Sequence, residues 1–400
     1  MRTPLGVAVL SAGIVLGLAL ALWPITPRIA FNDGLGYDGI YYAGMVRAMR
    51  DGAGAVPAER PHYAYRPLPM AVVAATAPGT NAEIARAFLA MNLVSLVLAG
   101  ALLGSTVHRV AGGVLLPAVA VLWFAALPGS VRWAMYYPVL VDGIGLLLLF
   151  ALVFTVAARM PLLFTILIGP AMLARENVVV LVPMLWLALL PGGVRRASLW
   201  SAVAGAVALA AYAWVRVAPP VPPAQPFDAL FEARQNLEWF FTTSRAERFA
   251  AAWPLALGLF ALVPLVAWRA GAAFLRRELA WLYYLVSTVA LIVVIGGDYD
   301  RYFLYLVPVL AVLAFGAAPH LWRSPAVLAL VTGLHLLVAR FAWPVGTSEA
   351  AYLRYGVATM DLASLHALLA AATIVAAIAA AVMILVSRPR GSATAQVPSS

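Results

Sequence analysis

Apolar runs of about 20 residues recur along the whole chain, and no other feature limits its fold as strongly. A helix of that length crosses the hydrocarbon core of a bilayer. Lipid offers no hydrogen-bond partner to the backbone, and the runs are too long for barrel strands, so the spans are expected to be helices. The composition agrees, because 64% of the residues are hydrophobic and only 10% are charged. The sequence predicts an all-α, polytopic integral membrane protein.

About twelve spans are expected, two of them short. Residues 4 to 23 form the first, and their apolar run is longer than that of a signal peptide, so an uncleaved anchor is expected. The others are expected at residues 81–105, 110–127, 138–158, 160–173, 177–191, 198–217, 252–268, 279–296, 302–318, 325–343 and 362–386. They make one transmembrane domain over residues 1–390, and the small, polar residues 391–400 are expected to be a disordered tail.

Two long segments separate the spans, at residues 24–80 and 218–251. In the first, Tyr41, Tyr42 and the methionines that follow recur at helical spacing, which predicts an amphipathic helix on the membrane surface. Residues 67–78 are apolar but too short to cross, so a second interfacial or re-entrant piece is expected there.

The arginines indicate how the chain sits in the membrane. With the N-terminus inside, the inner loops hold the unbalanced arginines and, among the acids, only Glu278. The positive-inside rule then places both termini in the cytoplasm and the two long segments on the outer face. Because the other acids fall on or near that face, carboxylate chemistry is expected outside the cytoplasm.

The residues that the sequence lacks exclude several classes of function. Cysteine is absent, which excludes disulfide, thiol and zinc-thiolate chemistry. The net charge of +10 comes from arginines scattered between the spans, which argues against nucleic acid as a partner. No Walker loop, GxSxG elbow, HExxH or dinucleotide fingerprint occurs. We therefore expect a substrate that is already activated, such as a lipid-linked phosphate ester.

The first outer segment carries two candidate catalytic carboxylates. Asp38 precedes a helical pattern, so it is the N-cap of that helix, a general base that deprotonates an acceptor hydroxyl, or both. Asp33, within Asn-Asp-Gly, is typical of a turn and is the second catalytic candidate. Tyr41, Tyr42 and His62, in the same segment, are candidates for binding substrate.

Further candidates lie where helices are expected to break or begin. Arg175 and Glu176 fall between two short apolar runs, where they satisfy the break or, through Arg175, contact an anionic ligand. Asp142 opens the fourth span, where an acid favours the positive end of the helix dipole. We expect a structural role for Asp142, with substrate binding as the alternative.

A second polar loop runs from Gly296 to Tyr302. Asp298 and Asp300 could hold a divalent cation, although two carboxylates make only part of a site. Arg301 is suited to a phosphate through its forked donors, or to a lipid headgroup as an anchor. The cofactor is left open, with a divalent cation as the candidate.

The stretch Asp38-Gly39-Ile40-Tyr41-Tyr42-Ala43, followed by two methionines, carries a pattern found in a known family. Three other stretches accompany it: Tyr137 to Asp142, Ala174 to Asn177, and Arg301 to Pro308. Together they resemble the GT-C superfamily of polytopic membrane glycosyltransferases. The first is similar to the Asp-Glu-x-x-Tyr-Ala…Met pattern of bacterial aminoarabinose and protein mannosyl transferases. Gly39 departs from that pattern, because those enzymes often have an acid there.

The resemblance implies an inverting transfer of a sugar from a polyprenyl-phosphate donor to an unidentified acceptor, at the outer face of a bacterial inner membrane. Asp38 would be the base, and Arg301, with Arg66 or Arg175, would hold the lipid phosphate.

Two other hypotheses stay open. One is a transporter or flippase of a lipid-linked or amphipathic solute, which the shortage of charges at mid-membrane disfavours. The other is a non-catalytic partner in an envelope assembly.

Overall fold

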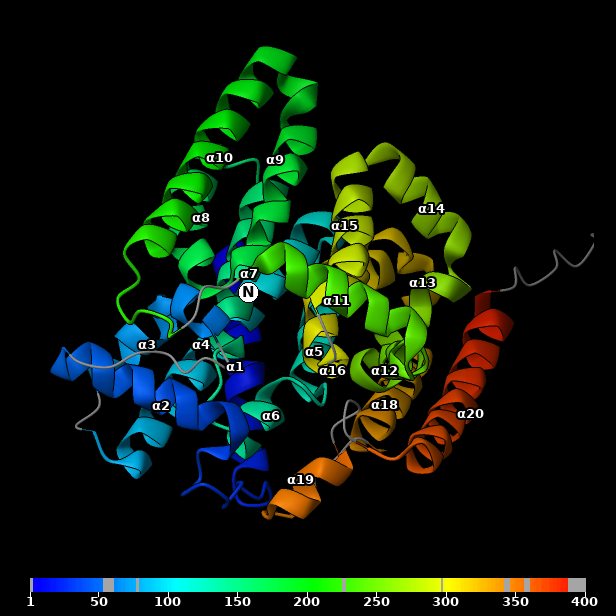
Figure 1. Ribbon diagram of the computed structural model, residues 1–400. Helices are drawn as coiled ribbons and strands as arrows, with labels where there is room; N and C mark the ends of the chain where they lie inside the picture. The colour runs from blue at the N-terminus through cyan, green and yellow to red at the C-terminus, as the bar shows by residue number, and fades with distance from the viewer. Residues whose placement is uncertain are drawn as a thin grey trace, which may run out of the picture.

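The computed structural model of the chain is all helical within the residues that it describes (Figure 1). Those residues are 3–52, 61–76, 79–224, 228–295, 298–341, 346–355 and 360–387. No β-strand occurs among them, so the all-α class predicted from the sequence is confirmed for this part. The tail expected at 391–400 lies outside the described residues.

The helices follow one another with short connections. The α-helices are α1 (Pro4–Leu22), α2 (Gly36–Asp51), α3 (Pro67–Ala74), α4 (Asn81–Ala111), α5 (Leu115–Ala126), α6 (Val131–Tyr136), α7 (Asp142–Ala157), α8 (Pro161–Ala174), α9 (Leu181–Leu189), α10 (Val194–Val217), α11 (Ala229–Thr242), α12 (Arg245–Leu257), α13 (Val263–Val266), α14 (Trp268–Arg277), α15 (Leu279–Ile295), α16 (Tyr299–Tyr302), α17 (Val307–Ala311), α18 (Pro325–Phe341), α19 (Glu349–Tyr355) and α20 (Leu362–Ser387). Short 3₁₀ helices are η1 (Pro61–Tyr65), η2 (Glu176–Val180), η3 (Leu190–Gly192), η4 (Gly258–Phe260), η5 (Phe303–Leu306) and η7 (Pro319–Trp322), and Val312–Ala317 form a π-helix.

Several helices have the length and composition of membrane spans. Within the described residues, five qualify: Pro4–Leu22, Asn81–Ala111, Leu115–Tyr136, Val194–Val217 and Leu362–Leu385. A sixth would come from α14 and α15, which are bent by 110° at a short break. Shorter apolar helices cover Asp142–Ala157, Pro161–Ala174, Glu176–Gly192, Phe303–Ala317 and Pro325–Arg340. The chain is thus a helical protein with several membrane-spanning candidates, while the count of about twelve stays a prediction.

The sequence marks the start of the two first long helices clearly. The Thr3 side chain caps α1, and proline follows it at the first helical position, where its missing N–H is not needed. Thr80 and Glu83 form a capping box at α4, because the backbone N–H of each donates to the side chain of the other. These caps satisfy N–H groups that have no partner within the helix.

The 31-residue helix α4 organises the N-terminal half of the protein. It packs against α1, α5 and α7, and buried side chains such as Leu96, Leu103 and Val107 fill the contact. A second group forms where α10 lies along α8 and α9 (Figure 1). Near the other end of the chain, α18 packs on α20. Close packing of apolar side chains stabilises these contacts, because lipid itself provides no hydrophobic drive between helices.

The segment at residues 24–80 contains helices at both expected places, α2 and α3. The sequence predicted that α2 lies on the membrane surface, but side chains on one face of the helix are buried in the protein. Tyr42 and Met45 are only 3% and 2% exposed, and the ring of Tyr42 lies 4.7 Å from that of Tyr63. The apolar face of α2 therefore packs inside the protein, against η1, α3 and the segment before α7.

The short helix α19 returns to the N-terminal part of the chain. In Figure 1 it lies beside the blue segment that precedes α2. The backbone N–H of Ala30 donates to the carbonyl of Thr347 at 2.8 Å, and the Tyr37 hydroxyl bonds the Glu349 carboxylate. The ring of Tyr352 lies 5.4 Å from that of Tyr37. These contacts join residues more than 300 positions apart.

Candidate functional site

A cavity of about 710 Å³ gathers most of the polar residues singled out in the sequence. Helix α2, the α8–η2 junction, the end of α10, and α11, α16 and α19 contribute to its walls. The predicted residues that line it are Asp38, Tyr42, His62, Arg66, Arg175, Glu176, Asp298 and Arg301. Its size is that of a pocket for a small molecule or for the headgroup of a larger one.

Asp38 lies in the first turn of α2, with its side chain 20% exposed. The prediction that it caps this helix is wrong, because the helix begins earlier and Leu35 is the N-cap residue. The chain turns sharply before α2, with left-handed backbone at Asn32, Asp33 and Gly34, and this turn sets where the helix starts. The carboxylate of Asp38 is thereby left to line the cavity.

The hydroxyl of Tyr137 holds the first turn of α2 in place through two backbone hydrogen bonds. Its oxygen accepts a hydrogen bond from the backbone N–H of Asp38 at 2.6 Å and one from Gly39 at 3.3 Å. Two glycines permit this approach. A Cβ at Gly36 would lie 2.6 Å from the Tyr137 ring, and one at Gly39 would lie 2.9 Å from Val139. The tyrosine thus takes the place of a side-chain cap, which α2 lacks.

Asn92, in α4, holds the irregular segment that carries Tyr137. Its side-chain amide donates to the carbonyls of Pro138 and Leu140, both at 2.9 Å. Asn92 is 1% exposed. Buried carbonyls between two helices need such donors, so Asn92 positions the break between α6 and α7. A lone asparagine in an apolar span has no distinctive spacing, so the sequence carries no signal for this role.

Asp142 joins two arginines into a buried cluster at the edge of the cavity. Its carboxylate accepts hydrogen bonds from Arg175 and, at 2.9 Å, from Arg301. Asp142 and Arg175 are only 8% and 5% exposed. Arg301 also contacts Asp298, and it lies 3.8 Å from the carboxylate of Asp38. Burial lowers the pKa of Arg301, but attraction to Asp298 and Asp142 outweighs this and holds the pKa above its ordinary range.

Arg66 and Glu176 form a second ion pair beside the cluster. The guanidinium donates two parallel hydrogen bonds to the carboxylate, at 2.9 and 2.7 Å. Burial raises the pKa of Glu176, but the charge of Arg66 overrides it and lowers that pKa to about 2. The pair links η1 to the α8–η2 junction, so both residues are fixed at the cavity wall.

The predicted cation site has only one described ligand side chain. The Asp298 carboxylate contacts Arg301, whereas the side chain of Asp300 lies outside the described part. In that part, no group of three or more histidine, aspartate or glutamate side chains could hold a metal ion. The positive charge of Arg301 beside Asp298 would also compete with a cation.

Besides Asp142, which lies behind the arginines, two predicted residues are absent from the described cavity lining. Asp33 accepts a hydrogen bond from the Asn81 side chain at 3.1 Å, at the turn before α2, as its interpretation as a turn residue implies. Tyr41 packs near Tyr63, with the ring centroids 6.1 Å apart. His62, in contrast, lines the cavity and its ring meets Tyr63 edge to face at 4.4 Å.

Several lining residues come from parts of the chain that sequence reasoning left out. Tyr352 belongs to α19, and Arg216, Asn236, Trp239 and Arg245 come from α10, α11 and the start of α12. For Asn236, Trp239 and Arg245, the signal in the sequence was the concentration of arginine and aromatic residues in the segment 218–251. Nothing in the spacing of the lining residues indicated that they face the segment 24–80.

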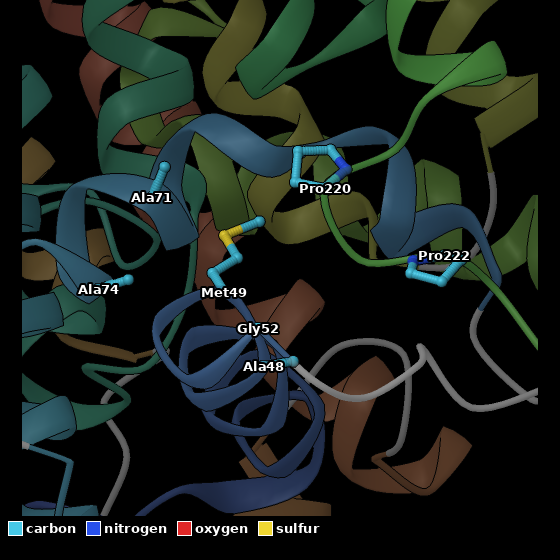
Figure 2. A pocket seen from close by; sticks show the side chains of 7 residues that line it. All are labelled: Ala48, Met49, Gly52, Ala71, Ala74, Pro220 and Pro222. Carbon is cyan, nitrogen blue, oxygen red and sulfur yellow. The ribbon is translucent and has the colours of Figure 1, made fainter.

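A second cavity of about 490 Å³ lies where α2 ends, beside α3 and the segment after α10. Figure 2 shows its lining, which is made of alanine, methionine, glycine and proline: Ala48, Met49, Gly52, Ala71, Ala74, Pro220 and Pro222. None of these side chains titrates, so this cavity offers no group for acid–base chemistry. The larger cavity is therefore the candidate site.

Comparison of the chain with protein-family models, curated proteins and solved structures gives no match.

Proposed function

We propose that the protein is a membrane glycosyltransferase that moves a sugar from a polyprenyl-phosphate donor to an acceptor on the outer face of a bacterial inner membrane. One observation carries the proposal: the Asp38 carboxylate lines the same cavity as Arg66, Arg175 and Arg301. A carboxylate beside a cationic wall suits a reaction in which a hydroxyl loses a proton and a phosphate leaves.

The reaction would proceed in one displacement. Asp38 accepts the proton of the acceptor hydroxyl, and the oxygen attacks the anomeric carbon of the sugar. The bond between that carbon and the phosphate oxygen breaks, and the lipid phosphate leaves with the electron pair. The arginines stabilise the negative charge that develops on the leaving group. The new glycosidic bond has the opposite configuration, as expected for a single displacement.

The membrane setting supports a lipid-linked donor. The helices of the protein are apolar enough to lie in lipid, and the sequence lacks the motifs that hold nucleotides. A polyprenyl-phosphate sugar carries its own leaving group and arrives through the bilayer. The distribution of arginines supports the orientation, with the first outer segment outside the cytoplasm.

The test is sugar transfer by the purified protein in nanodiscs. Radiolabelled polyprenyl-phosphate sugars serve as donors and a membrane extract supplies the acceptor. We expect label to move to the acceptor with wild type and with Asp51→Asn, a charge change at an exposed site of the same helix. With Asp38→Asn, transfer should fall by about a hundredfold or more, as for loss of a general base.

Two results would overturn the proposal. Full transfer by Asp38→Asn would remove this residue from the chemistry. Binding of donor by wild type without any transfer of label would favour the transport hypothesis, and flipping of the labelled lipid in liposomes would then be measured.

A further inference from the structure

Helix α14 meets α15 at a sharp corner. The two helices are bent by 110° at the break between Arg277 and Leu279. Since α15 is an apolar helix of 17 residues, α14 runs along the surface of the bilayer when α15 crosses it. The corner lies toward the top of Figure 1, as does the turn between α9 and α10, while α2 and α19 lie lower in the view. Both places carry arginines in loops that are expected on the inner face.

One face of α14 is packed on the protein. Gly271 and Phe274 are buried, and the helix contacts α15 and the π-helix Val312–Ala317. A Cβ at Gly271 would lie 3.8 Å from the Leu313 side chain, which is ordinary packing contact. This face therefore fixes how α14 is turned about its own axis, and so which side chains it presents outward.

The outward face of α14 is basic. Arg269, Arg276 and Arg277 are exposed, and the helical repeat places all three on the side away from Gly271 and Phe274. Among the described residues, none of the three arginines forms an ion pair. Three positive charges thus gather within ten residues, a surface that fits an anionic partner.

Apolar side chains border this basic face. Leu265, Trp268 and Leu279 are 68%, 58% and 51% exposed. The Arg269 guanidinium lies 5.5 Å from the centre of the Trp268 ring. Tryptophan beside basic residues is typical of a helix at the boundary of lipid and water, because the ring sits at headgroup level while the charges reach the phosphates. An acidic protein would match the arginines, but a lipid surface matches the exposed apolar side chains as well.

We infer that α14 is an interfacial helix whose basic face binds the headgroups of anionic phospholipids, such as phosphatidylglycerol, in the inner leaflet. The guanidinium groups of Arg269, Arg276 and Arg277 donate to phosphate oxygens, and Trp268 lies at the level of the headgroups. This inference does not depend on the proposed function, because α14 contributes no residue to the lining described for either cavity.

The test reads the lipids next to α14 and uses the absence of cysteine from the chain. Ala273 is exposed on the basic face, four residues from both Arg269 and Arg277. In Ala273→Cys protein, the single thiol carries a fluorescent dye. The protein is reconstituted in vesicles of phosphatidylcholine and phosphatidylglycerol in equal parts. A trace of one lipid or the other bears a nitroxide near its headgroup, and the ratio of quenching by the two shows which lipid gathers at α14.

We expect labelled phosphatidylglycerol to quench the dye about fivefold more than labelled phosphatidylcholine, the enrichment that one basic residue near an anionic surface gives. Arg276→Gln with Arg277→Gln should bring the ratio close to one, whereas lysine at both positions should keep most of it. High salt should also lower the ratio. Arg195→Gln with Arg196→Gln is the matched control, because it removes two exposed arginines at the start of α10 and should leave the ratio at Ala273→Cys unchanged.

Three results would overturn the inference. Equal quenching by the two lipids in the parent would show no selection of anionic headgroups. An equal fall in the α10 control would mean that total charge, rather than α14, gathers the lipid. Quenching by neither lipid would place α14 away from the bilayer and favour an acidic protein as its partner. Sugar transfer is not the readout, so its presence or absence decides the proposed function separately.

Discussion

The side-chain oxygen of Tyr137 accepts a hydrogen bond from the backbone N–H of Asp38 at 2.6 Å. This contact joins the break between α6 and α7 to the first turn of α2, across 99 positions of sequence. It fixes the backbone of the proposed base without occupying its carboxylate. The carboxylate therefore stays oriented toward the cavity that the arginines line.

Tyr137→Phe should separate this positioning role from packing. The ring that meets Gly36 is kept, while two N–H groups of α2 lose their acceptor. We expect stability to fall by about 1 to 3 kcal/mol, because two donors are left without their acceptor. Transfer should fall about tenfold, since a small displacement of a catalytic group is costly. Thermal unfolding in detergent and the transfer assay measure the two effects. Tyr136→Phe, the same change at the neighbouring buried tyrosine, is the control, and equal activities would contradict the role of Tyr137.

Gly36→Ala should destabilise the protein by about 2 kcal/mol or more, for two reasons. The residue has φ of 68°, which a side chain disfavours, and its Cβ would lie 2.6 Å from the Tyr137 ring. Gly44, in the same helix, has open space around it, so Gly44→Ala should be stabilising by about 0.5 to 1 kcal/mol. Chemical or thermal unfolding would check the contrast. Similar effects of both changes would mean that α2 does not approach Tyr137 closely.

Asp142→Asn should be far more damaging than Asp298→Asn. Asp142 is the buried carboxylate between Arg175 and Arg301, and its removal leaves two arginines without their shared negative partner. We expect a loss of about 3 to 5 kcal/mol, as found when one member of a buried ion pair is removed. Asp298, whose side chain is 44% exposed, should contribute about 1 kcal/mol or less. Midpoints of thermal unfolding in detergent give the comparison, and equal losses would rule out a central role for Asp142.

The ion pair of Arg66 and Glu176 predicts a pH dependence of stability. Folding lowers the pKa of Glu176 from its ordinary 4.5 to about 2. The unfolded chain therefore binds the proton more readily, so the contribution of this group is present above pH 4.5 and is lost as the pH falls through about 2. Glu176→Gln should lower the unfolding temperature at neutral pH, and the difference from wild type should shrink below pH 4.5. A difference that stays constant down to pH 2 would contradict the assignment.

The sequence by itself determined the class of fold and the neighbourhood of the site. Hydropathy and helical periodicity depend on residues close together in the chain, so the apolar helices, the helix after Asp38 and the break at Arg175 were all predictable. The acids and arginines in the polar segments between the apolar runs also indicated which side chains could form a site. The prediction that Asp38 is the N-cap was wrong, because the preceding turn decides where α2 begins.

Only the tertiary structure decided which of these residues meet. Arg66 and Glu176 are 110 positions apart, and Asp142 and Arg301 are 159 apart, so no local pattern could assign those pairs. The same holds for Tyr137 beneath α2 and for Arg245 across the cavity. Such contacts depend on how whole helices pack, whereas the sequence encodes only the face that each helix buries. The physical reason is that packing of apolar surfaces is non-directional, and specific partners follow from the geometry of the finished fold.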